Sequence, residues 1–255
     1  MKTDLNGRTA VITGGARGIG LAVARSLAAD GAKIALLDLL DNVEAAAKQI
    51  ADEYGVESLG QRLDVADQDA TIAAFDAVGG RLGVPQVLVT AAGIEINNDS
   101  VNVTADEWRK VIDVNLTGTF FAAQAFGSGL LQVGLPGSAI LISSMSAFIV
   151  NVPQWAASYN ASKAAVAHLG KSLAVEWALA GIRVNSIAPG YVLSDLTERI
   201  INQQPSLRDE WISRIPQGRI AAPGDLSGLV SFLASDVSSY LTAQTIVIDG
   251  GYTAV

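Results

Sequence analysis

Short, apolar segments rich in β-branched residues and leucine alternate along this chain with longer alanine- and leucine-rich stretches of helical character. Strands that are separated by helices of this length pair in parallel through right-handed crossovers. The strand-like segments are almost continuously apolar, as in Val87-Leu88-Val89 and Ile140-Leu141-Ile142. Such runs are expected where both faces of a parallel sheet are covered by helices. The pattern therefore predicts an α/β fold of three layers around a mostly parallel sheet.

We predict strands over residues 9–13, 33–38, 58–63, 86–90, 138–143, 183–187 and 245–248. We predict helices over residues 18–29, 41–54, 67–79, 104–127, 156–180 and 225–234. No linker, low-complexity segment or internal repeat interrupts this alternation. Residues 1–255 are therefore expected to form a single domain.

Composition excludes several classes of protein. Half of the 255 residues are hydrophobic and only 16% are charged, which fits a well-buried enzyme and argues against disorder. The absence of cysteine excludes a disulfide framework, a thiolate zinc site and a cysteine nucleophile. A net charge of −8 disfavours nucleic acid and anionic membranes as partners. With no signal-peptide pattern and no membrane-spanning run, we expect a cytoplasmic protein.

The first predicted strand runs into a glycine-rich turn, residues 13–20, and a helical stretch follows at once. Glycines in this place let the backbone approach a pyrophosphate, while the helix N-terminus points its free N–H groups at it. The spacing is Gly-x-x-x-Gly-x-Gly rather than the more familiar Gly-x-Gly-x-x-Gly. The turn is predicted to bind a dinucleotide through Gly14, Arg17, Gly18, Ile19 and Gly20.

Asp38 lies at the end of the second strand and favours NAD over NADP. An acid there accepts hydrogen bonds from both hydroxyls of the adenosine ribose and repels a 2′-phosphate. Arg17 favours the opposite choice, but the charge of Asp38 would lie against the 2′ position itself. Asp64 and Val65, after the third strand, are expected to bracket the adenine amino group; the alternative for Asp64 is a helix N-cap.

Tyr159 and Lys163 are four residues apart in an alanine-rich helix, so they lie on one face of it. A phenol has a pKa near 10 and is a poor acid or base at pH 7. An ammonium about 4 Å away, at an effective dielectric near 20, is worth roughly 4 kcal/mol, or about three pKa units. We therefore expect Lys163 to lower the pKa of Tyr159 into the range of efficient proton transfer.

The middle of the chain contains further small and polar residues that bear on the predicted site. Strand four leads into Ala91-Ala92-Gly93, small residues that leave room for a ribose or nicotinamide. Asn115 is an amide inside a long apolar helix, where it either kinks the helix or holds a water. His168 has no partner at ligand spacing and the acids do not cluster, so no metal is expected.

In chain order, these motifs resemble the short-chain dehydrogenase/reductase family over nearly the whole sequence. The matching features are Thr13-Gly14-x-x-x-Gly18-Ile19-Gly20, Ala91-Ala92-Gly93, Asn115, a serine after strand five with Tyr159-x-x-x-Lys163, and Pro189-Gly190 after strand six. The resemblance implies a Rossmann-type sheet of seven strands, a catalytic tetrad of Asn, Ser, Tyr and Lys, and commonly a homotetramer. Two departures are Thr90, where an asparagine is usual, and Ala243, where a glycine commonly precedes the last strand.

Carried over by position, Tyr159 is the acid/base, Lys163 holds the nicotinamide ribose and Asn115 anchors a water in the proton relay. The usual spacing to the tyrosine selects Ser146 as the serine that polarises the substrate oxygen. The segment from Ser144 to residue 154 instead resembles the polyol-dehydrogenase branch, which selects Ser144 and leaves Ser146 lining the pocket. We choose Ser144. The resemblance also places Pro189, Gly190, Val192 and Ser194 against the nicotinamide amide and the diphosphate.

The resemblance implies reversible oxidation of a secondary alcohol with NAD⁺ by hydride transfer. The polyol-branch pattern, with Glu95, Asn151, Gln154 and Tyr191 near the expected pocket, favours a sugar alcohol or similar small polyol. Nearby aromatic residues leave a cyclic or aliphatic alcohol open. Residues 191–216 are expected to form helices over the substrate as a mobile lid, the alternative being that Trp211 is ordinary core filling.

Two other functions stay open. A 3-oxoacyl thioester reductase usually uses NADPH, and Asp38 argues against it. A catalytically silent nucleotide-binding protein would typically have lost the tyrosine or the lysine, and both are present.

Overall fold

The computed structural model describes residues 3–255, with the side chains of residues 195, 196, 199 and 203 excepted. Within these residues, seven strands form one sheet in the order β3-β2-β1-β4-β5-β6-β7, and every neighbouring pair is parallel. The predicted α/β, Rossmann-type fold is confirmed. The strands are β1 (Thr9–Thr13), β2 (Lys33–Asp38), β3 (Ser58–Arg62), β4 (Pro85–Thr90), β5 (Gly137–Ile142), β6 (Ile182–Pro189) and β7 (Thr245–Ile248).

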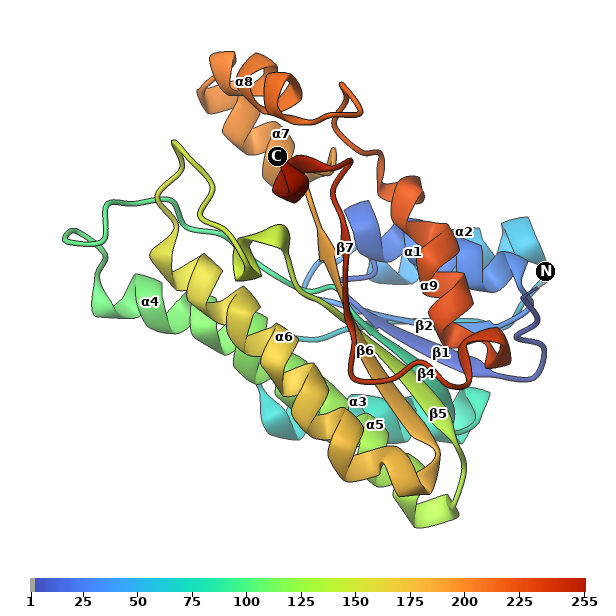
Figure 1. Ribbon diagram of the computed structural model, residues 1–255. Helices are drawn as coiled ribbons and strands as arrows, with labels where there is room; N and C mark the ends of the chain where they lie inside the picture. The colour runs from blue at the N-terminus through green and yellow to red at the C-terminus, as the bar shows by residue number, and fades with distance from the viewer. Residues whose placement is uncertain (1–2) are drawn as a thin grey trace.

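Helices cover both faces of the sheet, which gives the three layers visible in Figure 1. One face packs against α1 (Gly18–Ala29), α2 (Val43–Tyr54) and α9 (Ser227–Ala234). The other face packs against α3 (Gln68–Leu82), α5 (Gly118–Val133) and α6 (Ala157–Trp177). The two cores contain the alternate side chains of the same strands, for example Ile12 on one side and Val11 on the other. This double burial is why the strands read as continuously apolar.

The helix predicted over residues 104–127 is interrupted, and that prediction is wrong in its middle. The chain forms α4 (Ala105–Ile112), a π-helical turn (Asp113–Thr117) and then α5. Asn115 lies in the π-helical turn, and its side chain bonds to a loop and to α6 rather than to its own helix. Single π-turns inside helices recur at functional sites. The distorted helix, one of the two sequence-based alternatives for Asn115, is observed.

The order of the strands places a crevice between β1 and β4. The chain leaves β3 at one edge and returns to β4 beside β1, so the strand order reverses between these two strands. Gly14 and Ala91 follow these two strands, and the N–H of Ala91 donates to the carbonyl of Thr13 at 3.0 Å. In open parallel sheets, ligands bind at this point, beyond the carboxyl ends of the strands. Helices α7 (Asp195–Gln203) and α8 (Ser206–Arg214) lie beyond that end, with the C-terminus beside them (Figure 1).

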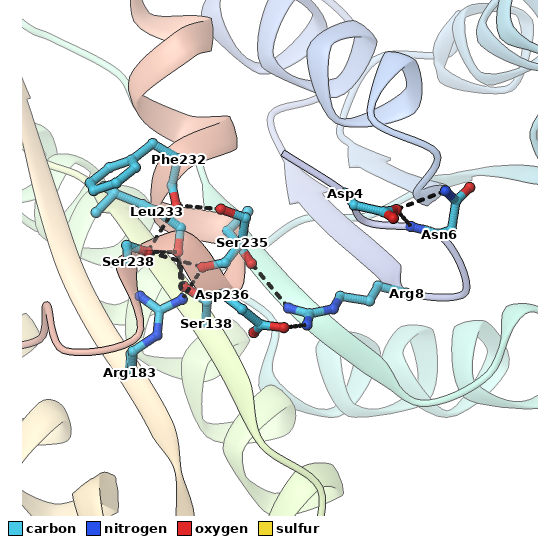
Figure 2. Close-up of polar contacts among 11 residues, drawn as sticks. Asp4, Asn6, Arg8, Ser138, Arg183, Phe232, Leu233, Ser235, Asp236 and Ser238 are labelled. Carbon is cyan, nitrogen blue, oxygen red and sulfur yellow. Dashed lines mark hydrogen bonds and ion pairs between the residues drawn. The ribbon is translucent and has the colours of Figure 1, made fainter. Parts of the chain in front are cut away.

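At the opposite end of the sheet, two arginines bind the last carbonyls of α9 (Figure 2). Arg183 on β6 donates to the carbonyls of Leu233 at 2.7 Å and Ser235 at 3.0 Å. Arg8 donates to the carbonyl of Ala234 at 3.3 Å. The last carbonyls of a helix have no partner within the helix and carry the negative end of its dipole. The arginines therefore attach α9 to β6 and to the segment before β1.

Ala243, just before β7, has a φ of +62°. This left-handed conformation costs an L-residue about 1–2 kcal/mol more than it costs glycine. The observation explains why the sequence position suits glycine. Among the described residues, no helix combines the length and the hydrophobicity needed to cross a membrane.

Candidate active site

A cavity of about 830 Å³ opens beyond the carboxyl ends of the central strands. Residues after β1, β2, β3, β4, β5 and β6 all reach it, so motifs that are far apart in the sequence share one space. The predicted site residues that line it are Gly14, Arg17, Gly18, Ile19, Gly20, Asp38, Asp64, Val65, Ala91, Ala92, Gly93, Glu95, Ser144, Ser146, Asn151, Gln154, Tyr159, Lys163, Pro189, Gly190, Tyr191, Val192 and Ser194. Asn115 is buried behind the wall of the cavity.

The glycine-rich turn at one end of the cavity fits an anion. Gly14 has a φ of +66°, and a Cβ on Gly20 would lie 2.0 Å from the carbonyl oxygen of Gly14. Gly18 has a φ of +54°, and a Cβ on it would meet only Ser194, at 3.6 Å. Among the described residues, no side chain caps the N-terminus of α1, and no acidic residue lies in its first turn. The N–H groups of that turn are therefore available to a diphosphate.

Asp38 is held rigidly at the rim of the same cavity. Its Oδ2 accepts from the N–H of Ala16 at 2.9 Å, and its Oδ1 accepts from the N–H of Leu40 at 3.0 Å. Each carboxylate oxygen has a second lone pair, so the fixed carboxylate retains acceptor capacity toward the cavity. Asp64 accepts from the N–H of Ala66, whereas Asp67 is the N-cap of α3. The alternative that Asp64 caps the helix is therefore wrong.

Ser144, Ser146 and Tyr159 meet at the centre of the cavity. The Ser144 hydroxyl donates to Ser146 Oγ at 3.1 Å and accepts from the N–H of Ser146 at 3.1 Å. The Ser144 side chain also lies close enough to the Tyr159 phenol to lower the pKa of Tyr159 in part. Of the two serines, Ser144 is the one that acts on the pKa of the phenol, and both line the cavity.

Lys163 does not lower the pKa of Tyr159, contrary to expectation. Burial, and then the charge of Glu95, raise the pKa of Tyr159 well above its ordinary value. The Lys163 ammonium lies 5.6 Å from the centroid of the Tyr159 ring and donates to the carbonyl of Ile142 at 2.9 Å. Burial in turn lowers the pKa of Lys163 to about 8, against the opposing charge of Glu95. Among the chain's own groups, desolvation outweighs the expected attraction between ammonium and phenolate.

The Asn115 side chain joins three segments behind this centre. Its Oδ1 accepts from the N–H of Ile94 at 2.8 Å, and its Nδ2 donates to the carbonyl of Ile94 at 2.9 Å and to Ser162 Oγ at 3.0 Å. Ser162 donates in turn to the carbonyl of Tyr159 at 2.7 Å. Both N–H donors of the amide are therefore used by the chain itself. The water that the resemblance assigns to Asn115 stays a prediction.

Glu95 follows Ile94 in the loop after β4 and is half-buried at the cavity wall. Burial raises its pKa to about 7, while a hydrogen bond from Asn97 and the charge of Lys163 oppose the shift. The carboxyl group is close enough to Tyr159, Tyr191 and Lys163 to act on the pKa of each.

Gln154 is fixed by two aromatic donors. Its Oε1 accepts from the Tyr191 hydroxyl at 3.0 Å and from Trp211 Nε1 at 3.2 Å. The Tyr191 and Trp211 rings stack with centroids 4.0 Å apart and an interplanar angle of 10°. An indole N–H only donates, so the atom that faces Trp211 is the amide oxygen, and the amide NH₂ points elsewhere.

The segment expected to be a lid forms helices α7 and α8 above the cavity. Trp211 on α8 is fully buried in a small third core with Met145, Tyr191 and Tyr252. It is therefore core filling, as the alternative held, and it also lines the cavity. The mobility of the lid stays a prediction.

Several residues of the site lie outside the sequence-based expectations. Ser143 donates to the carbonyl of Lys163 at 2.7 Å, which joins β5 to α6. Ser162 and Tyr252 complete the networks around Asn115 and Tyr191. Ser143 precedes Ser144, and Ser162 lies within the Tyr159-x-x-x-Lys163 motif. Their positions beside predicted site residues could therefore have indicated a role. Tyr252 comes from the far end of the chain and gives no local signal.

Comparison with known proteins identifies relatives of the whole chain. The family model described as Enoyl-(Acyl carrier protein) reductase matches residues 14–253. The chain is 40% identical over 263 residues to the ribulose-forming D-arabinitol 2-dehydrogenase of Candida tropicalis, covering 97% of this chain and 93% of that protein. Among solved structures, a short-chain type dehydrogenase/reductase from Mycobacterium marinum has 40% identity and a TM-score of 0.95, covering 100% of this chain and 98% of the other. A gluconate 5-dehydrogenase from Burkholderia cenocepacia J2315, in complex with NADP and tartrate, has 35% identity and a TM-score of 0.93, with the same coverage.

Proposed function

Because the chain belongs to the short-chain dehydrogenase/reductase family, we propose that it interconverts a secondary hydroxyl of a neutral polyol and the matching ketone with NAD. The chain is an oxidoreductase that acts on CH–OH groups. The observation that carries the proposal is that Ser144, Tyr159 and Lys163 line the same cavity as the glycine-rich turn, with Ser144 close enough to the phenol to act on its pKa. Hydride transfer requires a nucleotide and an alcohol oxygen in one enclosed space. The glycine-rich turn suits the nucleotide, and Ser144 and Tyr159 suit the alcohol oxygen.

The nucleotide would be held by the glycine turn, the N-terminus of α1, Asp38 and residues 189–194. When bound, NAD⁺ supplies the hydride acceptor and a positive charge. The chain supplies the proton transfer. Tyr159 receives the proton of the substrate hydroxyl during oxidation and returns it during reduction, and Ser144 holds the substrate oxygen. The raised pKa of Tyr159 keeps the phenol protonated among the chain's own groups, which suits reduction of a ketone.

Asp38 supports NAD rather than NADP. Two backbone N–H groups fix its carboxylate at the cavity rim, so it does not swing away from a ribose bound there. A 2′-phosphate beside this carboxylate would meet a like charge in a partly desolvated place. The Burkholderia relative binds NADP, so the preference is a property to be measured on this chain.

The polar lining near Tyr159 supports a hydroxyl-rich substrate. Glu95, Asn151, Gln154 and Ser146 line the same cavity as Ser144 and Tyr159. The Oδ1 atom of Asn151 is buried and has no hydrogen-bond partner among the described residues. Each of these side chains can form a hydrogen bond with a substrate hydroxyl but not with an alkyl chain. A polyol therefore fits them better than an aliphatic alcohol or an acyl thioester.

The test is a substrate panel on the purified full-length protein. D-Arabinitol, galactitol, cyclohexanol and, for reduction, a 3-oxoacyl thioester are each measured with both cofactors. We expect polyol oxidation with NAD⁺ favoured over NADP⁺, and a loss of at least about a hundredfold in kcat for Tyr159→Phe. Tyr240→Phe is the matched control, because Tyr240 is fully exposed and outside the cavity. An unchanged rate in Tyr159→Phe, or activity confined to the thioester, would reject the proposal.

A further inference from the structure

The loop that carries Glu95 is anchored on both sides of this residue. On one side, the backbone N–H and C=O of Ile94 are both bonded to the Asn115 side chain, at 2.8 and 2.9 Å. On the other side, the N–H of Asn98 donates to the carbonyl of Trp155 at 2.9 Å, and the two segments form a short parallel bridge. The carboxyl group therefore has a fixed place at the cavity wall.

Glu95 faces the reacting centre rather than the nucleotide turn. The groups that it acts on electrostatically are Tyr159, Tyr191 and Lys163. Lys163 is the cation facing it, and the ammonium is already bonded to the carbonyl of Ile142. The cavity lining also contains the neutral polar side chains of Ser146, Asn151 and Gln154, and α4 and the π-helical turn after it add the charged residues Asp106, Arg109, Lys110 and Asp113.

A carboxylate at this place distinguishes a hydroxyl from an acid. A substrate hydroxyl donates a charge-assisted hydrogen bond to a carboxylate, which is stronger than a bond between neutral groups. A substrate carboxylate has no proton to donate, and its charge is repelled across a partly desolvated gap. The same loop geometry therefore favours a polyol and disfavours the sugar acid of equal size.

We propose that Glu95 is the specificity-determining residue of this enzyme, binding a hydroxyl next to the reacting carbon of a neutral polyol and excluding sugar acids. The inference rests on the proposed function and names the substrate class of the same site. Glu95 takes no part in hydride or proton transfer. Its effect is therefore on the choice between substrates.

The experiment compares Glu95→Gln with the wild type on a neutral polyol, D-arabinitol, and an anionic one, D-gluconate. Glutamine keeps the size and removes the charge. We expect the ratio of kcat/KM for arabinitol to kcat/KM for gluconate to fall at least about tenfold, through both a loss on the polyol and a gain on the acid. Asp99→Asn is the control, since it removes a charge from the same loop outside the cavity lining. That ratio should stay unchanged in the control.

Two further measurements separate the possible outcomes. NAD binding by protein fluorescence should be equal in all three proteins, which shows that the fold is intact. Inhibition of the wild type by tartrate should be weaker than inhibition by the matching neutral tetritol, threitol. An unchanged ratio in Glu95→Gln, a wild type that prefers gluconate, or an equal loss of kcat on both substrates would each overturn the inference. Absence of any NAD-linked alcohol oxidation would instead reject the proposed function itself.

Discussion

Asn115 shows how one side chain can organise the site from behind its wall. Its amide fixes Ile94, and through that backbone it fixes the loop that carries Glu95. Through Ser162 it reaches the carbonyl of Tyr159. The same residue therefore places the proposed acid/base and the proposed specificity residue relative to each other. The π-helical turn is the local distortion that lets an amide in a helix reach both.

The ionisation of Glu95 gives a pH dependence with a defined sign. Its pKa is raised to about 7, mainly by burial, so the group becomes anionic as pH rises through neutrality. The charge then strengthens the bond to a polyol hydroxyl and the repulsion of a sugar acid, which is ionised throughout. We expect the arabinitol-to-gluconate ratio of kcat/KM to rise from pH 5.5 to 7.5. Steady-state kinetics on both substrates at each pH measures it.

The ratio isolates Glu95 from the groups that face it. Tyr159 and Tyr191 have raised pKa values, and Lys163, with a pKa of about 8, keeps most of its charge up to pH 7.5. Any effect of these groups on the common chemical step cancels in the ratio. In Glu95→Gln the ratio should rise much less steeply over the same range, and the remaining slope reports Lys163, whose pKa falls when the charge of Glu95 is removed. A profile of the same slope in this variant would assign the titration to another group.

At the scale of elements, Gln154 joins parts of the chain that are distant in sequence. It lies between β5 and α6, Tyr191 follows β6, and Trp211 belongs to α8. Tyr252, near the C-terminus, packs edge-on against Tyr191 with ring centroids 5.5 Å apart. Because both donors are directed at Oε1, the lid and the strand end hold the amide in one orientation. The NH₂ group is then free to donate to a substrate hydroxyl.

Gln154→Leu should therefore weaken the enzyme selectively toward polyols. We expect kcat/KM for D-arabinitol to fall about tenfold, the value of one lost hydrogen bond of roughly 1.4 kcal/mol. With cyclohexanol, which has no second hydroxyl, the fall should be less than about threefold. Steady-state kinetics on the two alcohols measures the difference. Equal losses on both would show that Gln154 only packs the lid.

The sequence predicted the helices and strands better than the side-chain contacts that connect them. Strands and helices follow from local periodicity, so β1, β2 and α1 were placed without error in their bounds. The break at Asn115 was foreseen only as one of two alternatives, because its cause is a set of bonds to Ile94 and Ser162 across the fold. The pKa of Tyr159 was expected with the wrong sign. Spacing in a helix reveals which groups are neighbours, but it does not reveal how deeply they are buried.

At the scale of the whole molecule, one end of the sheet carries the candidate site and the other carries contacts that stabilise the fold. The carboxyl ends of the strands carry the cavity and the motifs that the sequence displays. The amino ends carry the arginine contacts to α9, which no motif indicated. The acceptors in these contacts are backbone carbonyls. Every residue has one, so the amino-acid sequence does not indicate which of them accept. The site was therefore more predictable than the interactions that hold the opposite end together.

Arg183 is expected to stabilise the fold without affecting the chemistry. Its guanidinium donates to the carbonyls of Leu233, Ser235 and Leu241. Arg183→Met keeps an unbranched apolar side chain but removes the guanidinium and its three hydrogen bonds, while Ser138, Ser238 and Asn185 still donate to the same carbonyls. We expect a loss of about 2–4 kcal/mol in the free energy of unfolding, because each of the three lost hydrogen bonds contributes about 0.5–1.5 kcal/mol. In a chain of this size this lowers Tm by about 5–10 °C, as measured by thermal unfolding.

Asp236→Asn provides the contrast at the same place. Asp236 pairs with Arg8 at 2.6 Å, but 82% of its side chain is exposed. A surface ion pair contributes about 0–1 kcal/mol and weakens with salt. We therefore expect a change in Tm several times smaller than for Arg183→Met, and unchanged kcat/KM for both variants at 25 °C. Equal destabilisation by the two variants would mean that the exposed ion pair, rather than the carbonyl contacts, attaches α9 to the sheet.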